Sequence, residues 1–178
     1  PNNRPWLPAL DLPLYAPPHA WVLSGHVFEH RRTVRERLSY TLVSYPRYHT
    51  GALAAGERAA ALQLPESLSG RVRALAQRWR ANASVDIDVA RAALAYFRDE
   101  PFFYTLTPPL LGSDAVDEFL FSARRGFCGH FASAFVTLMR AAGIPSRIVQ
   151  GYLGGEYNPA GKYWIVRQSD AQIGRAHV

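Results

Sequence analysis

The apolar positions between residues 68 and 97 recur with the period of an α-helix and predict two amphipathic helices. The first helix is expected to bury Leu68, Val72, Leu75, Ala76 and Trp79. Its opposite face carries the polar residues Arg71, Arg73, Gln77, Arg78 and Arg80. The second helix, capped by Ser84 or Asp86, is expected to bury Val89, Ala92, Ala93, Tyr96 and Phe97.

Two further helical patterns follow along the chain. Ser113 and Asp114 are suitable caps for a helix whose apolar face holds Val116, Phe119 and Leu120. A longer helix opens at Cys128, directly after a loop that contains glycine, and its apolar positions are Phe135, Leu138, Met139 and Ala142. Its predicted end is the sequence Gly-Ile-Pro at 143–145, because glycine favours the end of a helix and proline cannot continue one.

Strand patterns lie on both sides of the helices. Residues 1–20 are rich in proline, which fixes φ and removes a backbone donor, so this stretch is expected to be extended. Residues 38–45 and 102–106 are rich in β-forming side chains and predict short strands. Near the end, 146–153 predicts a strand and 163–168 its hairpin partner, across a turn of glycine, asparagine and proline.

This order of elements predicts an α+β fold. The helices come first and antiparallel strands follow, without the regular βαβ alternation of a parallel sheet. We expect residues 1–64 to form an extended lead-in and a small β element, and residues 65–171 to form the core.

The composition is that of a folded domain with a basic surface. The 178 residues are 48% apolar and 19% charged, which suits one domain with an extension. The formal net charge is +6, but the arginines are scattered and no nucleic-acid-binding motif accompanies them. We therefore interpret most of these charges as a solvated face and expect no nucleic-acid partner.

We expect neither a membrane span nor a signal peptide within these residues. No run approaches the ~18 consecutive apolar residues of a spanning helix. The chain starts at Pro1 without a methionine, so we expect an excised piece of a longer protein. A single cysteine is compatible with either cytoplasm or periplasm.

That single cysteine, Cys128, is the strongest candidate for chemistry. A lone cysteine forms no disulfide within its chain, and its commonest role is to pack as a small hydrophobe. At a helix N-terminus, however, the helix dipole favours the thiolate, and free backbone N–H groups can bind a developing oxyanion. A thiol nucleophile also needs a base and a group that orients this base.

Three segments together resemble the bacterial transglutaminase-like superfamily. They are Gly-Phe-Cys-Gly-His-Phe-Ala at 126–132, Arg-Ala-Ala-Gly-Ile-Pro-Ser-Arg at 140–147 and Val-Gln-Gly-Tyr at 149–152. The resemblance spans about residues 65–171, and the agreement of several fixed spacings makes it specific.

The resemblance implies a papain-like α+β fold, in which the helix with the nucleophile packs on an antiparallel sheet. It also implies that Cys128 attacks an amide or peptide carbonyl, releases an amine and leaves a thioester. Water would then give hydrolysis or deamidation, and an amine would give crosslinking. The expected partner is a protein or peptide amide, with a cell-wall-associated substrate among the options. We expect no cofactor and identify no metal-binding residues, and metal dependence stays open.

Part of the chain also resembles a narrower group within the superfamily. The leading segment and residues 102–106 are similar to large bacterial inner-membrane proteins that hold this domain in the periplasm. The resemblance therefore implies a periplasmic domain of a membrane-embedded parent protein.

The chain departs from the family pattern near its end. The family sequence Ser-Asp-Ala-His-Ala-Trp is here Ser-Asp-Ala-Gln at 169–172, so Gln172 takes the position of the catalytic histidine. Glutamine accepts no proton near neutral pH and cannot be a general base. The orienting aspartate would lie beyond Val178. We expect residues 172–178 to be a non-native tail and the piece itself to be inactive.

The other candidates do not replace that histidine. His130 lies two residues after the cysteine and points elsewhere on a helix, and His177 lies near a chain end, where order is usually poor. The remaining histidines are dispersed without metal-site spacing. Asp170 is expected to be a turn or strand-end residue. Tyr152 and Trp164 are expected to pack in the core, and the lining of a cleft is the alternative for both.

Two further possibilities stay open. The same fold could be a non-catalytic domain that binds peptides or cell-wall polymer, for which a basic surface is suitable. Without its later strands the sheet would expose an edge, so we also expect self-association through the strand at 163–168 or its neighbours.

Overall fold

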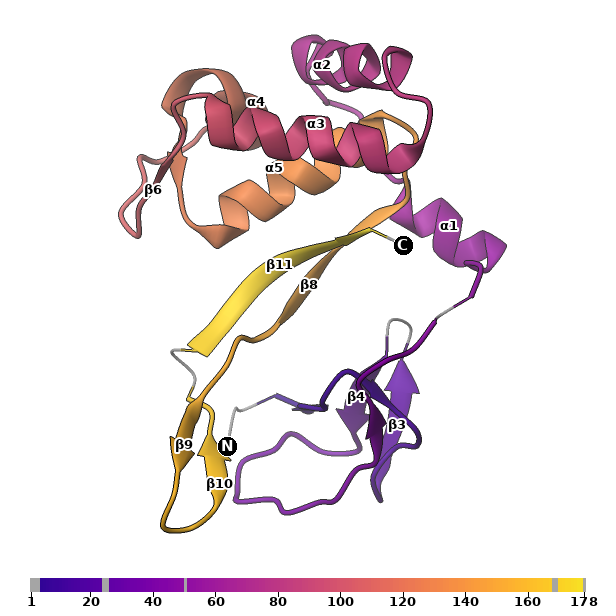
Figure 1. The fold of residues 1–178 in the computed structure, drawn as a ribbon, viewed down its shortest axis with the longest axis vertical. Coiled ribbons are helices and arrows are strands. Elements are labelled where there is room, and N and C mark those ends of the chain that lie inside the picture. Colours follow the sequence, from indigo (N-terminus) through magenta and orange to yellow (C-terminus); the bar gives the residue numbers. More distant parts are fainter. Residues whose placement is uncertain (1–3, 24–25, 50, 168–169, 178) are drawn as a thin grey trace. The chain divides into compact units, whose positions relative to one another are not determined.

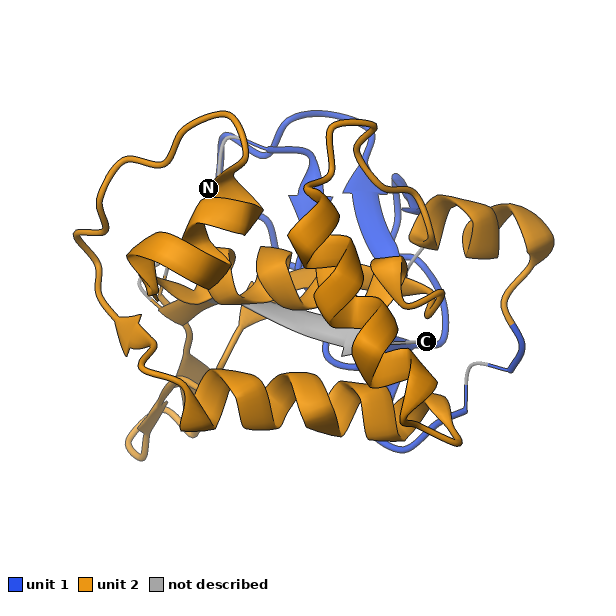
Figure 2. Ribbon diagram, turned by 90° about the horizontal axis from the view of Figure 1, so that it is seen from above, with its two compact units in different colours: residues 1–52 blue, residues 53–178 orange. Residues whose placement is uncertain are grey.

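The computed structural model describes residues 4–23, 26–49, 51–167 and 170–177, the last six of these by their backbone alone. Gln168, Ser169 and Val178, which enter the sequence predictions, lie outside the described residues. The chain divides into two compact units, Pro1–Ala52 and Leu53–Val178 (Figure 2). This division falls twelve residues before the predicted boundary at 64/65, because a further helix belongs to the second unit.

Short strands build the first unit. They are β1 (Trp6–Leu7), β2 (Leu12–Pro13), β3 (Ala20–Leu23), β4 (Val27–His30) and β5 (Ser44–Tyr45). Strands β1, β4 and β3 form an antiparallel sheet in that order, and β2 pairs with β5. Phe28 in the central strand is completely buried, so it anchors the small core of this unit.

The strand predicted over 38–45 forms only at its last two residues. The facing segment is rich in proline, which has no N–H to donate to a ladder. Isolated contacts take the place of regular pairing: the Tyr40 hydroxyl donates to the carbonyl of Pro8 at 2.7 Å, and the Leu14 N–H donates to that of Val43 at 2.8 Å.

Helices dominate the second unit (Figure 1). They are α1 (Ala55–Ala61), α2 (Gly70–Ala81), α3 (Asp86–Asp99), α4 (Ala115–Glu118), its π-helical continuation η1 (Phe119–Ala123), and α5 (Cys128–Ala141). The sequence predicted all of these except α1, an alanine-rich turn in which Ala61 is the one buried residue. In the part of the chain that is described, no helix is long and apolar enough to cross a membrane.

The beginning of α3 differs from the prediction. Neither Ser84 nor Asp86 caps it: the N-cap is Val85, which supplies no side-chain hydrogen bond. Asp86 instead forms an ion pair with Arg80 at 2.5 Å, which links α3 back to the end of α2. On the inner face Ala90 is buried in place of the predicted Ala92.

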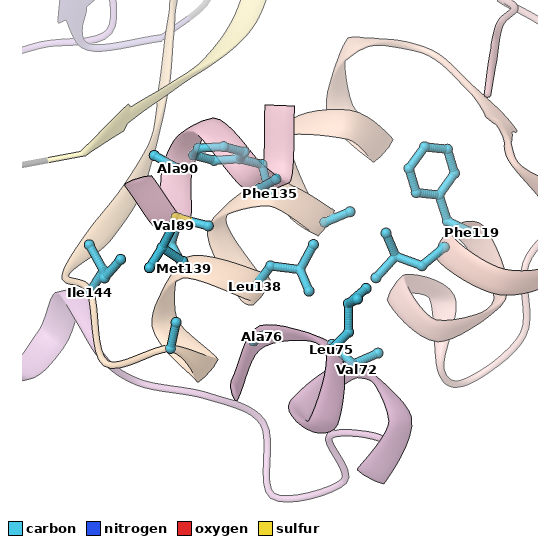
Figure 3. Close-up of a cluster of buried hydrophobic side chains, with 14 residues drawn as sticks. Val72, Leu75, Ala76, Val89, Ala90, Phe119, Phe135, Leu138, Met139 and Ile144 are labelled. Carbon is cyan, nitrogen blue, oxygen red and sulfur yellow. The ribbon is translucent and has the colours of Figure 1, made fainter. Parts of the chain in front are cut away.

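The core of this unit surrounds α5. Figure 3 shows side chains of α2, α3, η1 and α5 that converge on one another. The buried cluster comprises Val72, Leu75, Ala76, Val89, Ala90, Ala93, Phe119, Leu120, Ala134, Phe135, Leu138, Met139, Ala142 and Ile144. Truncation of a fully buried leucine such as Leu138 to alanine typically costs about 2–5 kcal/mol. The helix that begins at Cys128 is therefore held rigidly.

The strands after α5 pair differently from the prediction. They are β8 (Ser146–Tyr152), β9 (Glu156–Asn158), β10 (Tyr163–Ile165) and β11 (Ala171–His177). The predicted partnership of 146–153 with 163–168 is wrong, because β10 pairs with β9, and β8 pairs with β11. Gly154, at φ +78°, ends β8 before the chain resumes as β9. The first strand after α5 therefore pairs with the last, and the two strands between them pair with each other.

The helix α5 lies against both β8 and β11 (Figure 1). The predicted α+β arrangement, with the cysteine-bearing helix on an antiparallel sheet, is confirmed. A further short pair, β6 (Phe103–Tyr104) and β7 (Arg125–Gly126), is parallel, and its second strand lies directly before α5 in the chain.

Candidate active site

Cys128 is the first residue of α5 and is partly exposed. The preceding residue, Phe127, is extended (φ −103°, ψ −178°) and acts as the N-cap. Its carbonyl accepts the first helical hydrogen bond, from the N–H of His130 at 2.9 Å. The N–H groups of Cys128 and Gly129 therefore precede the first bonded residue, where an α-helix offers them no partner of its own. Such groups can bind a negative oxygen beside the thiol.

The loop before the cysteine is clamped to β6. The carbonyl of Arg124 accepts from the Phe103 N–H at 2.8 Å, and that of Gly126 accepts from the Thr105 N–H at 2.9 Å. Arg124 has a left-handed backbone (φ 50°), and its guanidinium forms a 2.9 Å ion pair with Glu100. These contacts determine the direction in which the chain enters α5.

The ring of His130 packs on this loop. Its Nδ1 accepts from the Phe127 N–H at 3.3 Å, and its centroid lies 4.4 Å from that of Phe127 and 5.7 Å from that of Phe119. A Cβ on Gly126 would lie only 2.7 Å from the Cβ and Cγ of His130, so this approach requires glycine. The Nδ1 lone pair, which a base would need, is thus engaged by the loop.

The Arg-Ala-Ala-Gly-Ile-Pro-Ser-Arg sequence joins α5 to β8. Gly143 adopts φ +79° and ends the helix, and the fully buried Ser146 donates its hydroxyl to the Ile144 carbonyl at 3.2 Å. Arg140 donates from Nε to the carbonyl of Ser146 at 2.8 Å and from Nη1 to that of Gln63 at 2.9 Å. Burial lowers the pKa of Arg140, but an arginine stays charged at neutral pH.

Gln172, which the sequence analysis expects at the position of the catalytic histidine, lies on β11. The backbone of Gln172 is opposite Gly151 of β8, and β11 lies against α5. His177 pairs with Ser146 at the other end of the same strand, five residues along. At the usual rise of a strand this is about 17 Å from position 172. The strand therefore does not bring the backbone of His177 to that position.

The other residues singled out in the sequence have clear places. Asp170 closes a turn, since its Oδ2 accepts from the Arg167 N–H at 2.7 Å and its carbonyl accepts from the Leu153 N–H at 3.1 Å. Trp164 is 65% exposed on β10, so the expectation of core packing is wrong for it, and Tyr152 on β8 is also exposed. No cluster of three metal-ligating side chains is found in the described ranges.

The family model of the transglutaminase-like superfamily matches residues 73–178. The chain belongs to the transglutaminase-like superfamily. It is 42% identical over 172 residues to a protein-glutamine gamma-glutamyltransferase of Pseudomonas aeruginosa, and 43% identical over 103 residues to the uncharacterized protein YebA of Bacillus subtilis. These alignments cover 96% and 56% of the present chain, but only 26% and 14% of the two relatives.

The fold is also that of a solved relative. The crystal structure of the periplasmic domain of TgpA from Pseudomonas aeruginosa matches with a TM-score of 0.91 and 40% identity, over all of this chain and 65% of that one. A second crystal structure of the same domain, bound to ethylmercury, matches with the same TM-score and identity over 68% of its chain. These matches confirm the superfamily predicted from the three sequence segments.

Sequence reasoning missed the contacts that support the cysteine. The close approach of His130 to Gly126, the clamp by β6 and the carbonyl contacts of Arg140 were not predicted. A signal for them was present, because the glycine two residues before the cysteine and the arginine before the Gly-Ile-Pro turn both lie in the matched segments. The spacing of these residues identifies the family, whereas the contacts that they make are seen only in the structure.

Proposed function

We propose that this chain carries the nucleophile of a thiol acyltransferase that acts on carboxamides. The observation that carries the proposal is the place of Cys128 at the first position of α5, beside the N–H groups of the first turn. The name of the Pseudomonas relative, a protein-glutamine gamma-glutamyltransferase, supports a glutamine side chain as the acyl donor.

The proposed reaction has two steps. The Cys128 thiolate attacks the carboxamide carbon, a C–S bond forms, the C–N bond breaks, and the nitrogen leaves as ammonia after it gains a proton. The thioester then passes its acyl group to a primary amine, which forms an isopeptide bond, or to water, which forms a carboxylate and completes deamidation. The N–H groups at the start of α5 are suitable to stabilise the negative oxygen in both steps.

The proton transfers require a base, and Gln172 cannot supply one. The expectation that this chain has no appreciable turnover on amides rests on that residue. The chain spans about a quarter of the length of the Pseudomonas relative, so the activity of a whole protein is a separate matter. We also propose a periplasmic location within a membrane-anchored protein, which the solved periplasmic domain of TgpA supports.

An activated ester tests the nucleophile without the missing base. Cys128 should release about one equivalent of p-nitrophenolate per chain from p-nitrophenyl acetate, because this leaving group needs no protonation. Mass spectrometry of the digested chain should find the acetyl group on the peptide with Cys128. The matched control is Cys128→Ser, which should abolish the burst. A burst that survives in Cys128→Ser, or no burst in the original chain, would contradict the proposal.

A gain-of-function variant tests the position of the base. Gln172→His should raise the incorporation of a fluorescent primary amine into a glutamine peptide by at least about a hundredfold, the low end of what a general base contributes. The double variant Gln172→His/Cys128→Ser is the control and should be inactive. If the burst occurs but this gain does not, the nucleophile stands and position 172 is not that of the base.

A second candidate function, a non-catalytic binding domain, is favoured by Gln172 itself and by the net charge of +6. It predicts saturable binding of a glutamine peptide or an anionic cell-wall fragment in calorimetry, without any burst. Binding of this kind should be the same in Cys128→Ser as in the original chain.

A further inference from the structure

We infer that His130 is a positioning residue for the Cys128 thiol and acts through the backbone of Phe127. This inference rests on the proposed nucleophilic role of Cys128. His130 is the third residue of α5, and its Nδ1 accepts the N–H of the N-cap Phe127 at 3.3 Å. It thereby satisfies a donor at the helix start, as a glutamate or glutamine does in a capping box.

This hydrogen bond specifies the chemical form of the ring. Nδ1 accepts only when it carries no proton, so the proton of the neutral imidazole must be on Nε2. A doubly protonated ring has no acceptor and places a positive charge at the positive end of the helix dipole. The neutral ring with its proton on Nε2 is therefore the form that holds the loop.

Packing keeps the ring in this place. Phe127 and Phe119 contact it, and Gly126 leaves space for its Cβ and Cγ, where any larger residue would collide. The imidazole is thus fixed by contacts on several sides as well as by its hydrogen bond. A side chain held in this way keeps its partner, the Phe127 backbone, in one orientation.

The consequence reaches the thiol through a single peptide unit. Phe127 directly precedes Cys128, and its extended backbone sets the angle at which α5 begins. When the N-cap bond is lost, the first turn of a helix frays, and the dipole and free N–H groups beside the sulfur lose their alignment. The reactivity of Cys128 should therefore depend on the acceptor at position 130.

Three variants separate positioning from packing. His130→Leu keeps apolar bulk but removes the acceptor, whereas His130→Gln keeps an acceptor of the capping-box type. Phe97→Leu is the matched control: Phe97 packs on Phe119 in the same aromatic cluster and lies outside the loop before the cysteine. The thermal midpoint of each variant records any general loss of stability.

Two measurements at about pH 8 give the test. In His130→Leu, amide exchange at Phe127 should be about two- to tenfold faster, the range expected for one lost hydrogen bond. Alkylation of Cys128 by iodoacetamide should be at least about threefold slower, because the aligned helix start favours the reacting thiolate. His130→Gln should restore both rates towards those of the original chain, and Phe97→Leu should leave both unchanged.

The inference is overturned if alkylation of His130→Leu is unchanged or faster, if His130→Gln behaves like His130→Leu, or if Phe97→Leu gives the same slowing. These outcomes do not depend on turnover. If there is no ester burst but the alkylation rate of Cys128 depends on the acceptor at position 130, the proposed function fails and the positioning of the thiol stands. If the burst occurs but the alkylation rate does not depend on position 130, only the present inference fails.

Discussion

Arg140 donates from Nε to the carbonyl oxygen of Ser146 at 2.8 Å, so the last turn of α5 is tied to the first residue of β8. The helix that begins at Cys128 and the strand that pairs with β11 are thereby fixed to each other. Because Nη1 of the same side chain reaches the carbonyl of Gln63 at 2.9 Å, the segment after α1 is fixed to the same point.

Loss of this contact should reduce stability without direct effect on the cysteine. We expect Arg140→Ala to lower the free energy of unfolding by about 1–3 kcal/mol, because it leaves the carbonyl of the fully buried Ser146 without this donor. Arg140→Lys should recover part of this loss, since an ammonium can reach one carbonyl but not both in a fixed fork. Urea denaturation measures both. Arg73→Lys, at an exposed site on α2, is the control, and equal losses at the two sites would contradict this role.

The stability that the contact between α2 and α4 contributes should depend on pH. Asp117 is buried and accepts from Ser69 Oγ at 2.5 Å and from Arg71 Nε at 2.7 Å, and the Arg71 hydrogen bond lowers the pKa of Asp117. A lowered pKa in the folded state means that the stabilisation is present above the ordinary carboxyl pKa, about 4, and is lost as the pH falls through the folded value.

Asp117→Asn should therefore destabilise the protein by about 2 kcal/mol near neutral pH, and by progressively less in acid. Chemical denaturation at a series of pH values measures this difference. Asp86→Asn is the control, since that carboxylate forms an exposed ion pair with Arg80, of a kind that contributes about 0–1 kcal/mol. A gap between Asp117→Asn and the original chain that stays constant down to low pH would contradict the prediction.

Replacement of glycine by alanine should change the stability of the fold in opposite directions at two positions. Gly143→Ala meets no atom within 4 Å, but φ is +79°, so we expect a loss of about 1–2 kcal/mol from the backbone alone. Gly70→Ala, in the first turn of α2, also meets open space and has no such φ, so it should stabilise by about 0.5–1 kcal/mol. Thermal unfolding of the two variants measures the contrast, and equal signs would argue against this account.

Sheet edges should allow self-association. In the described part of the chain, β10 has β9 as its one partner and β11 has β8. Unpaired strand edges favour pairing with a second copy. We expect a concentration-dependent rise in the weight-average mass in sedimentation equilibrium, and Trp164→Lys, at an exposed position on β10, should reduce it. A single monomeric species at all concentrations would count against this prediction.

Burial explains which parts of the fold the sequence predicts well. Val72, Leu75 and Leu138 recur at helical spacing because they all face one core, so the periodicity alone locates α2 and α5. The helix α1 has no such apolar face, since Ala61 is its one buried residue, and the sequence pattern therefore does not predict it.

Backbone geometry explains what the sequence could not predict. Several glycines follow β8, and only the structure shows that Gly154 adopts a positive φ there and that β8 pairs with β11. At the site, the place of Cys128 followed from a helix-start pattern, whereas the fit of His130 against Gly126 is a contact between side chain and backbone that no periodicity records. Family spacing flagged these positions, and only the structure gives their roles.

The hydrogen bond between Leu153 and Asp170 has a consequence for how the domain tolerates change in length. This bond joins the residue after β8 to the residue before β11. The hairpin of β9 and β10 lies between these two residues in the chain, and its strands pair with each other. Residues 154–167 are therefore a natural place for insertion or exchange: an arm of different length could be grafted there while the register of β8 with β11, and the cysteine-bearing helix against them, stays as it is.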